Sequence, residues 1–291
     1  MPEPRFPDLL GIGTQRSGTT WLWKNLTHCP SLYVPPFKEI HYLDMRGQIP
    51  SPGQQQFRAS QLQDVLHAIQ NGAPNDQALV QWFGRFALAK RNDDAWYASL
   101  FTDAEAHQLA IDFTPSYCRM TPDQIARVVT LIPHVRVILM LRDPIDRAWS
   151  QMHLNLRLKR QPPLQTPGEF QRWCQSPEVS GYQQYADILE RWTAAIGRER
   201  IFIGFYEELQ TQPAALLERL LQWLGVPFEP GQFGDSIHAV YNKTTSRVIP
   251  EDFARAAAPA MLPGLLPLTR HLDGPPVAWL DRCKRLMGIP V

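Results

Sequence analysis

The sequence predicts an α/β protein built around a mostly parallel central sheet, and three observations support this prediction. Apolar runs of strand length alternate along the chain with longer segments of helical periodicity. The run at 135–142 is almost continuously apolar, as expected for a strand covered on both faces. No clear linker interrupts the 291 residues, so we expect one domain. Its core should lie at about 8–250, and residues 226–291 should close a ligand site and pack as a tail.

The expected elements follow from apolar periodicity and from residues that begin or end helices. Strands are expected at 8–13, 31–34, 107–113, 135–142 and 200–205. Helices are expected at 19–29, 60–70, 80–101, 121–133, 143–158, 181–197, 214–225 and 275–288. Ser60 is expected to cap its helix, and Gly225 is a typical helix end. Residues 45–60 are rich in Gln, Pro, Ser and Gly and are expected to form a surface loop, and the Pro- and Gly-rich tail from 226 is expected to be less regular.

Charge and cysteine usage exclude several classes of protein. Lys and Arg number 29 against 28 Asp and Glu, so the net charge of +1 gives no general attraction for a polyanion. Any bound anion must therefore be held at a local site. The four cysteines lie far apart, which excludes a CxxC zinc or redox motif, and no metal site is expected. The sequence shows no signal peptide and no apolar stretch of transmembrane length, so a cytoplasmic protein is expected.

The first candidate site is the glycine-rich segment GIGTQRSGTTWL at 11–22. It follows an apolar run and precedes a helix, an arrangement in which backbone N–H groups and a helix N-terminus bind an anion. Gly13 and Gly18 fit the spacing of a Walker A loop, but Thr19 stands where that loop has lysine. The alternative is an ordinary connection between a strand and a helix. The residues expected at the anion are Arg16, Ser17, Gly18, Thr19 and Thr20.

The second candidate site follows the strongest predicted strand, within LRDPIDRAWS at 141–150. Arg142 ends the strand, at the edge where open α/β sheets bind ligands. Ser150 lies a little over two turns into the next helix, from which it can reach the same compact anion. The alternative is that Arg142 pairs with Asp143 or Asp146.

Together the two segments resemble the sulfotransferases that use 3′-phosphoadenosine-5′-phosphosulfate (PAPS). In that family a [KR]xGTT loop holds the 5′-phosphosulfate, and residues 16–20 match this loop. An Arg and a Ser in an RDPxxRxxS context hold the 3′-phosphate, and Arg142 and Ser150 match this pair. FKEIHYLD at 37–44 and DFTPSY at 112–117 resemble the family segments KE[IV]HFFD and EK[ST]PxY. The resemblance spans about 8–250 and is closest to the bacterial and glycan-modifying branch. It implies a three-layer fold like that of the P-loop NTPases.

The implied activity is a sulfotransferase reaction, with PAPS as co-substrate and no metal. The implied acceptor is a hydroxyl of a glycan, a glycolipid or a small metabolite, with a carrier-bound acyl chain as the alternative. No nucleic-acid partner is expected. Two other functions remain open: a P-loop kinase or NTPase, which the missing lysine after Gly18 disfavours, and a non-catalytic nucleotide-binding relative.

The resemblance also implies individual catalytic residues. Glu39 matches the general base of the glycan-sulfating enzymes, and His41 is the rival base. The alternative for Glu39 is a surface ion pair with Lys38. Arg16 stands where the family most often has lysine, and it would stabilise the leaving phosphate. A general base contributes about 10²–10⁴-fold to such a reaction.

Further residues are implied around the nucleotide and the acceptor. Trp21 is a candidate for the cofactor site. The family closes over the cofactor where this chain has the loop at 240–247, and Lys243 and Arg247 are the candidates there. Asp112 and Tyr117 are expected at the acceptor, with core packing as the alternative for Tyr117. Phe113 replaces the lysine of the family's EK[ST]P segment, which argues against a heparan-like acceptor.

Overall fold

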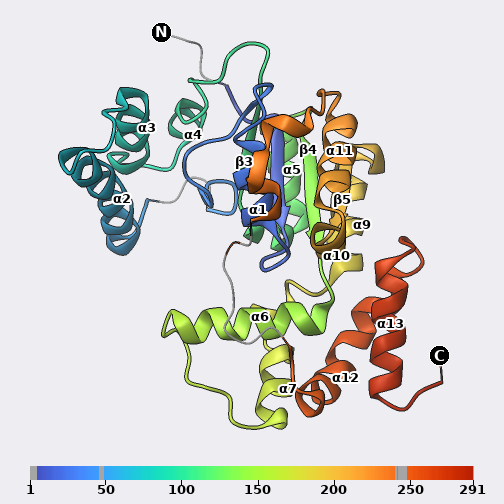
Figure 1. Cartoon of the computed structure of the whole chain (residues 1–291). Helices are drawn as coiled ribbons and strands as arrows, with labels where there is room; N and C mark the ends of the chain where they lie inside the picture. Colours follow the sequence, from blue (N-terminus) through green and yellow to red (C-terminus); the bar gives the residue numbers. More distant parts are fainter. Residues whose placement is uncertain (1–4, 46–48, 240, 242–247, 291) are drawn as a thin grey trace.

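A single five-stranded sheet forms the centre of the protein, in a computed structural model that describes residues 5–45, 49–239, 241 and 248–290. The strands run in the order β2-β3-β1-β4-β5, and every neighbouring pair is parallel. Their bounds are β1 (Leu9–Gly13), β2 (Leu32–Tyr33), β3 (Leu109–Phe113), β4 (Arg136–Leu141) and β5 (Ile201–Phe205). The predicted α/β class with a parallel sheet is confirmed (Figure 1).

Helices cover both faces of the sheet. On one face lie α1 (Thr19–Leu26), α10 (Tyr206–Thr211) and α11 (Pro213–Leu224), and on the other lie α5 (Pro122–Leu131) and α9 (Tyr185–Ile196). Successive residues of a strand point to opposite faces. Val137 and Leu139 of β4 therefore pack into one core, while Ile138 and Met140 pack into the other. Two apolar faces explain why this strand reads as a continuous apolar run.

A third group of helices lies beyond the carboxyl ends of the strands (Figure 1). Its members are α6 (Pro144–Arg157), α7 (Pro167–Gln175), α8 (Pro177–Ser180), α12 (Glu251–Leu268) and α13 (Pro275–Leu286). The expectation of a less regular tail was wrong for α12, whose interior holds three prolines. Proline weakens a helix because it removes a hydrogen bond and clashes with the preceding turn. Here a buried stripe that includes Met261 and Leu265 offsets that cost.

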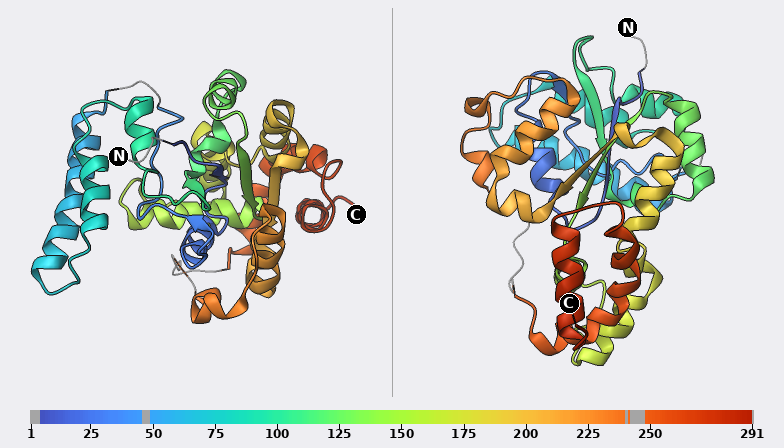
Figure 2. Two further views of the ribbon diagram at one scale, coloured as in Figure 1. Left: turned by 90° about the horizontal axis from the view of Figure 1, so that it is seen from above. Right: turned by 90° about the vertical axis from the view of Figure 1, so that its right-hand side faces the viewer.

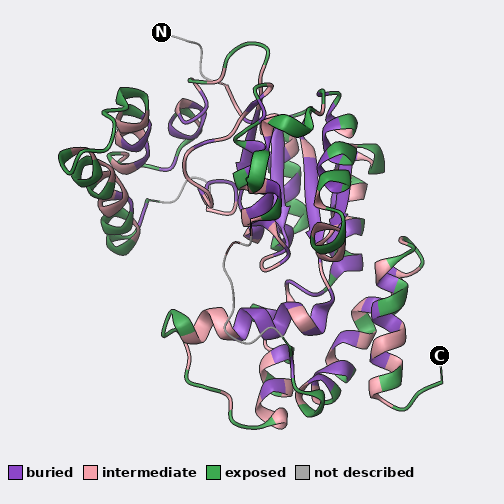
Figure 3. Cartoon of the chain, in the orientation of Figure 1, coloured by how far each residue is buried: buried purple, intermediate pink, exposed green. Residues whose placement is uncertain are grey.

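Helices α2 (Pro52–Gln70) and α3 (Gln77–Ala87) form an arm beside the sheet, joined to it through α4 (Asp94–Ser99). Figure 2 shows the arm on the opposite side from α12 and α13, and Figure 3 shows that α2 is largely exposed. The expected start at Ser60 was wrong. Ser51 caps α2 in a capping box with Gln54, and Pro52 follows it, so the glutamine-rich stretch is helical.

The C-terminal helix α13 holds the junction between β4 and α6. Arg282 forms ion pairs with the buried Asp143 at 2.6 Å and with Asp146 at 3.0 Å. The carboxylate of Glu207 accepts hydrogen bonds from the Trp279 indole and from the backbone N–H of Asp143, each at 3.1 Å. Asp143, which directly follows Arg142, is therefore held in place by a helix from the far end of the sequence.

The remaining short elements are 3₁₀ turns: η1 (Pro115–Arg119), η2 (Arg198–Arg200), η3 (Pro230–Gln232) and η4 (Gly234–His238). No helix in the described ranges is long and apolar enough to span a bilayer.

Candidate functional site

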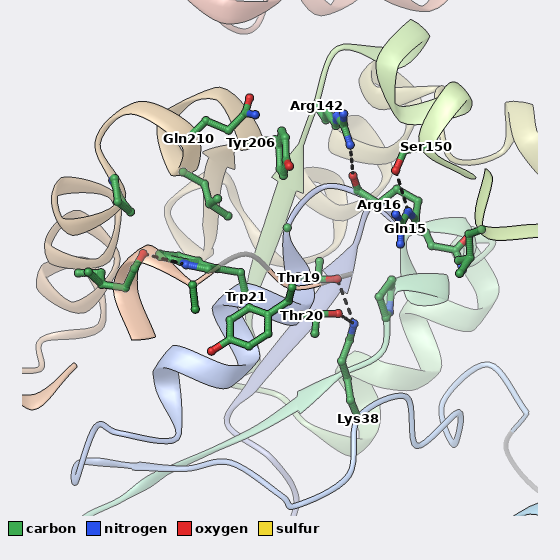
Figure 4. A pocket seen from close by; sticks show the side chains of 18 of the residues that line it. Gln15, Arg16, Thr19, Thr20, Trp21, Lys38, Arg142, Ser150, Tyr206 and Gln210 are labelled. Atoms are coloured by element: carbon green, nitrogen blue, oxygen red, sulfur yellow. Dashed lines mark hydrogen bonds between the residues drawn. The ribbon is translucent and has the colours of Figure 1, made fainter. Parts of the chain in front are cut away.

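A cavity of about 550 Å³ opens where β1 and β4 end and α1 and α6 begin. This is the edge of a parallel sheet at which ligands bind in open α/β folds. Figure 4 shows that its lining side chains come from the first loop, α1, the segment after β2, the end of β4, α6 and α10. Residues predicted from separate parts of the sequence line it together: Arg16, Gly18, Thr19, Thr20, Trp21, Glu39, Arg142 and Ser150.

The first loop makes a tight turn into α1. Gly18 has a φ of +88°, and a side chain there would meet Leu209 on α10, so glycine suits this position. The hydroxyls of Thr14 and Ser17 share a 2.7 Å hydrogen bond beneath the loop. Ser17 is fully buried and does not line the cavity. Of the predicted loop residues, Ser17 therefore supports the turn, whereas the others face the cavity.

Arg16 and Arg142 lie together at one end of the cavity. The Nε of Arg16 donates to the Ser150 hydroxyl at 2.9 Å, and Nη1 of Arg142 donates to the backbone carbonyl of Arg16 at 3.1 Å (Figure 4). Arg142 also stacks over the ring of Tyr206 at 4.2 Å. The strand-end arginine and the helix serine thus meet the first loop, instead of Arg142 pairing with Asp143, whose carboxylate contacts Arg282.

The charge around Arg16 favours an anion. Burial and the positive charges of Arg142 and Arg157 lower the pKa of Arg16 to about 10. A fully buried third arginine, Arg147, donates to the carbonyl of Gln15 at 3.4 Å. Concentrating guanidinium groups in this way costs free energy in the empty protein, and a bound anion relieves it. This end of the cavity is therefore suited by charge to an anionic ligand.

Lys38 also lines the cavity, although sequence reasoning placed it only as a surface partner of Glu39. Its ammonium donates to the hydroxyls of Thr19 at 3.2 Å and Thr20 at 3.0 Å, and it pairs with Glu39 at 3.4 Å. The Lys38 side chain is 14% exposed. Burial lowers its pKa, which the charge of Glu39 opposes and that of Arg16 reinforces. A sequence cannot show this position, because residue 38 reaches α1 only through the folding of the sheet.

Glu39 lies between two cations. Its carboxylate is 3.4 Å from the Lys38 ammonium and 3.8 Å from Nε2 of His41. Burial raises the pKa of Glu39, but the contacts with His41 and Lys38 outweigh burial and leave it below its ordinary value. Nδ1 of His41 contacts Asp44 at 3.0 Å, and Ser116 donates to the same carboxylate at 2.6 Å.

Two carboxylates keep His41 protonated. Burial lowers its pKa, but the hydrogen bonds and charges of Asp44 and Glu39 outweigh burial and raise it to about 10. Near neutral pH the ring is therefore an imidazolium that has no lone pair to accept a proton. His41 is not among the residues that line the described cavity.

The backbone is strained at the same residues. Of the four non-glycine residues with positive φ in the described part of the chain, three are Arg16 at 72°, Glu39 at 66° and His41 at 56°. Each such residue costs of order 1–3 kcal/mol and persists only where surrounding structure enforces it. Such strain concentrates at functional sites.

Asp112 and Tyr117, the residues expected at the acceptor, lie in the interior of the protein, where core packing was the alternative for Tyr117. Both are fully buried and neither lines the described cavity. The Tyr117 hydroxyl donates to Asp112 at 2.8 Å and accepts the backbone N–H groups of Tyr42 and Leu43, each at 3.2 Å. Burial raises the pKa of Asp112 to about 6 despite three donors to its carboxylate. The pair therefore supports the segment that carries Glu39 and His41 from below.

The remaining predicted residues have mixed positions. The Trp21 indole lines the cavity and donates to the carbonyl of Ile237 at 3.1 Å. Lys243 and Arg247 lie outside the described residues. Tyr206 was not predicted, and its only sequence signal is its position directly after a strand. No group of metal-ligating side chains occurs in the ranges that the structure describes.

Residues 7–230 match the model of the sulfotransferase family. The chain is 26% identical over 163 residues to the membrane-associated sulfotransferase kil1 of Dictyostelium discoideum, covering 55% of this chain and 26% of that protein. It is 22% identical over 234 residues to the bifunctional heparan sulfate N-deacetylase/N-sulfotransferase 1 of Caenorhabditis elegans, covering 77% and 23%. The chain thus spans about a quarter of the length of these curated relatives.

Solved structures show the same fold. A sulfotransferase from Alicyclobacillus acidocaldarius superposes with a TM-score of 0.63 at 20% identity, covering 94% of this chain and 99% of that one. The sulfotransferase domain of the olefin synthase from Synechococcus PCC 7002 gives 0.54 at 19% identity, covering 94% and 98%. The family match over most of the sequence, together with this fold, leads to one conclusion: the chain belongs to the sulfotransferase family.

Proposed function

We propose that this protein transfers the sulfuryl group of PAPS to a hydroxyl acceptor. The observation that carries the proposal is that one cavity holds both an anion-binding end and a candidate base. Arg16, Arg142 and Ser150 meet at one end, and Glu39 lines the same cavity and pairs with Lys38, which contacts the start of α1. Family membership supports the reaction class, and the arginine cluster supports a nucleotide with two separate phosphate groups.

Each residue has a defined task in this proposal. Arg142 and Ser150 bind the 3′-phosphate, while Arg16, Thr19 and Thr20 bind the 5′-phosphosulfate. Glu39 takes the proton of the acceptor hydroxyl as its oxygen bonds to sulfur. The bond from sulfur to the bridging oxygen breaks, and its electron pair stays on the leaving 5′-phosphate, where Arg16 stabilises the charge. Positioning and electrostatics of this kind supply most of the catalysis in the related phosphoryl transfers.

We propose Glu39, and not His41, as the base. The pKa of Glu39 lies below its ordinary value, so this carboxylate is ionised and able to accept a proton near neutral pH. The raised pKa of His41 leaves it protonated in the same range. His41 is therefore a positioning residue that orients Glu39 and is itself held by Asp44 and Ser116.

For the acceptor we propose only a chemical class, a hydroxyl of a glycan, a glycolipid or a small metabolite. An acceptor screen with labelled PAPS, followed by mass spectrometry of the product, identifies it. Glu39→Gln should lower the transfer rate by about 10²–10⁴-fold while nucleotide binding persists.

A binding comparison tests the donor before any acceptor is known. Calorimetry with 3′-phosphoadenosine-5′-phosphate (PAP) and with ATP should show clear preference for PAP, because the 3′-phosphate has its own arginine. Preference for ATP would instead favour a kinase or NTPase. Tight PAP binding without transfer to any acceptor would favour a non-catalytic relative.

A further inference from the structure

Arg147 is a fully buried arginine to which the proposed function gives no role. In the part of the chain that the structure describes, no carboxylate pairs with its guanidinium, and its Nε has no hydrogen-bond partner. A buried charge without a counter-ion opposes folding, and burial also lowers the pKa of Arg147. A cost of this kind points to a use for the remaining donors of the guanidinium.

Three segments of the chain meet at the Arg147 guanidinium. Its Nη1 donates to the carbonyl of Gln15 at 3.4 Å and to the side-chain oxygen of Gln151 at 2.7 Å. Its Nη2 donates to the carbonyl of Val179 at 3.3 Å. These partners belong to the first loop, to α6 and to α8. The planar fork of the arginine therefore connects the first loop with the helices beyond the strand ends, in a geometry that a lysine ammonium does not offer.

The contact with Gln15 bears on the conformation of the next residue. Arg16 has a φ of 72°, in the left-handed region. The carbonyl before it accepts from Arg147, and its own carbonyl accepts from Nη1 of Arg142 at 3.1 Å. Because peptide groups are planar, the orientations of these two carbonyls fix the backbone angles of the residue between them. The two guanidinium groups thus enforce the strained conformation of Arg16.

Helix α6 also holds the side chain of Arg16. Ser150 lies three residues after Arg147 on α6, so the two residues share one face of the helix. The Ser150 hydroxyl accepts a hydrogen bond from Nε of Arg16 at 2.9 Å (Figure 4). One helix face therefore fixes Arg16 twice, through the peptide group that precedes it and through its guanidinium.

We propose that Arg147 is a positioning residue that holds Arg16 in the conformation needed for sulfuryl transfer. The inference rests on the proposed function, in which Arg16 stabilises the charge on the leaving 5′-phosphate. Arg147 is not among the residues that line the described cavity, so its effect on the reaction passes through Arg16. A displacement of about 1 Å at a reacting group lowers a rate by about 100-fold.

The test measures PAPS cleavage, which needs no acceptor other than water. Water attacks sulfur, the bond from sulfur to the bridging oxygen breaks, and PAP, sulfate and protons are released. Chromatography quantifies the PAP. Arg147→Met should lower kcat for this reaction by about 100-fold. The dissociation constant of PAP, measured by calorimetry, should rise by less than about tenfold, because the proposed phosphate ligands themselves remain.

A double-mutant cycle separates positioning from a general structural role. Arg16→Ala alone should lower kcat by about 10²–10³-fold, the loss typical of one oxyanion donor. In the Arg16→Ala background, Arg147→Met should lower kcat by less than about a further threefold, because the side chain through which Arg147 acts is already missing. A variant that merely distorts the cavity would lower kcat by the same factor in both backgrounds.

Two further variants complete the test. Arg200→Met is the matched control, because Arg200 also donates to two backbone carbonyls, those of Ile196 and Pro133. It lies before the start of β5, at the opposite edge of the sheet from the cavity, and its loss should leave kcat and PAP binding unchanged. Arg147→Lys keeps the buried charge and covers the case in which the methionine variant folds poorly. Its single ammonium does not reproduce the fork, so it should lower kcat by at least about tenfold.

The outcomes separate the inference from the function on which it rests. A near-normal kcat for Arg147→Met or for Arg147→Lys overturns the inference, as does an equal loss of PAP affinity and of kcat. An undiminished effect of Arg147→Met in the Arg16→Ala background also overturns it. A wild-type protein that neither binds PAP nor cleaves PAPS contradicts the proposed function itself.

Discussion

Replacing Arg142 with alanine tests the assignment of the 3′-phosphate most directly. Arg142 contributes in two separable ways. It holds the first loop through the carbonyl of Arg16 and the ring of Tyr206, and in the proposal it binds the 3′-phosphate. The loop contacts are worth about 1 kcal/mol each, and their loss weakens every nucleotide. The contact with phosphate weakens only nucleotides that carry the 3′-phosphate.

The expected loss of affinity follows from the strength of hydrogen bonds between the Arg142 guanidinium and the 3′-phosphate. A hydrogen bond between charged groups is worth about 1.5–3 kcal/mol, and Arg142 is half-buried, so about 3 kcal/mol is a reasonable sum for its contact with phosphate. At 1.4 kcal/mol per factor of ten, the loss is about 100-fold. The affinity ratio of PAP to AMP, which differ only in the 3′-phosphate, should therefore fall by about 100-fold.

Competition calorimetry measures this ratio, with AMP as the weak ligand. Arg136→Ala is the matched control, because Arg136 lies at the opposite end of β4 and contacts carbonyls of Trp223 and Leu224. It should lower stability without changing the ratio. If Arg142→Ala weakens PAP and AMP by the same factor, the arginine only supports the loop and the 3′-phosphate lies elsewhere.

Three further predictions concern the supports of the site. The rate of PAPS cleavage should stay level from mildly acidic to neutral pH, because the pKa of Glu39 is lowered and His41, whose pKa is raised from 6.5 to about 10, stays charged. The stability that charged His41 contributes is complete below pH 6.5 and disappears as pH rises through about 10. His41→Gln should move the acid limb upward, and an unmoved limb in a pH–rate profile contradicts this coupling. Arg282→Ala should cost about 2–3 kcal/mol in denaturant unfolding because it leaves the buried Asp143 carboxylate unpaired, and a second change, Asp143→Asn, should restore part of it. Tyr117→Phe should cost about 2 kcal/mol and lower the melting temperature by about 5 °C, with PAP affinity retained, since two backbone N–H groups lose their acceptor; unchanged melting would disprove this role.

The sheet and most helices could be predicted because their signals are local. The apolar run at 136–141 is buried on both faces, and Thr121 and Gly225 act as helix ends as expected. The single helix expected at 80–101 is two helices, α3 and α4, and α7 and α8 were not expected. Two further errors, at α2 and α12, have local causes. The start of α2 was not predicted because its residues are mostly polar, although a capping box starts the helix there. Helix α12 was not predicted because it contains three prolines, although its buried stripe outweighs their cost.

The site was only partly predictable. The loop around Arg16 and the pair of Arg142 and Ser150 carry motif spacing, and the fold brings them to one cavity. Lys38 belongs to the segment FKEIHYLD that resembles the family's KE[IV]HFFD, but the sequence indicated only an ion pair with Glu39 and not its contacts with Thr19 and Thr20. Asp112 and Tyr117 match a family segment. Their mutual hydrogen bond beneath the segment that carries Glu39 and His41 depends on the packing of η1 against residues 42–43. Contacts of this kind depend on tertiary structure, which local sequence patterns do not report.

The left-handed backbone at Arg16, Glu39 and His41 has a consequence for laboratory evolution of this protein. Glycine adopts that conformation without steric cost, so glycine substitutions at these positions relieve strain in the folded chain. A selection for heat resistance alone would therefore reward changes that remove the proposed catalytic groups. Thermostable variants should accordingly be sought with these positions held constant, and a screen that scores folding without turnover would enrich inactive protein.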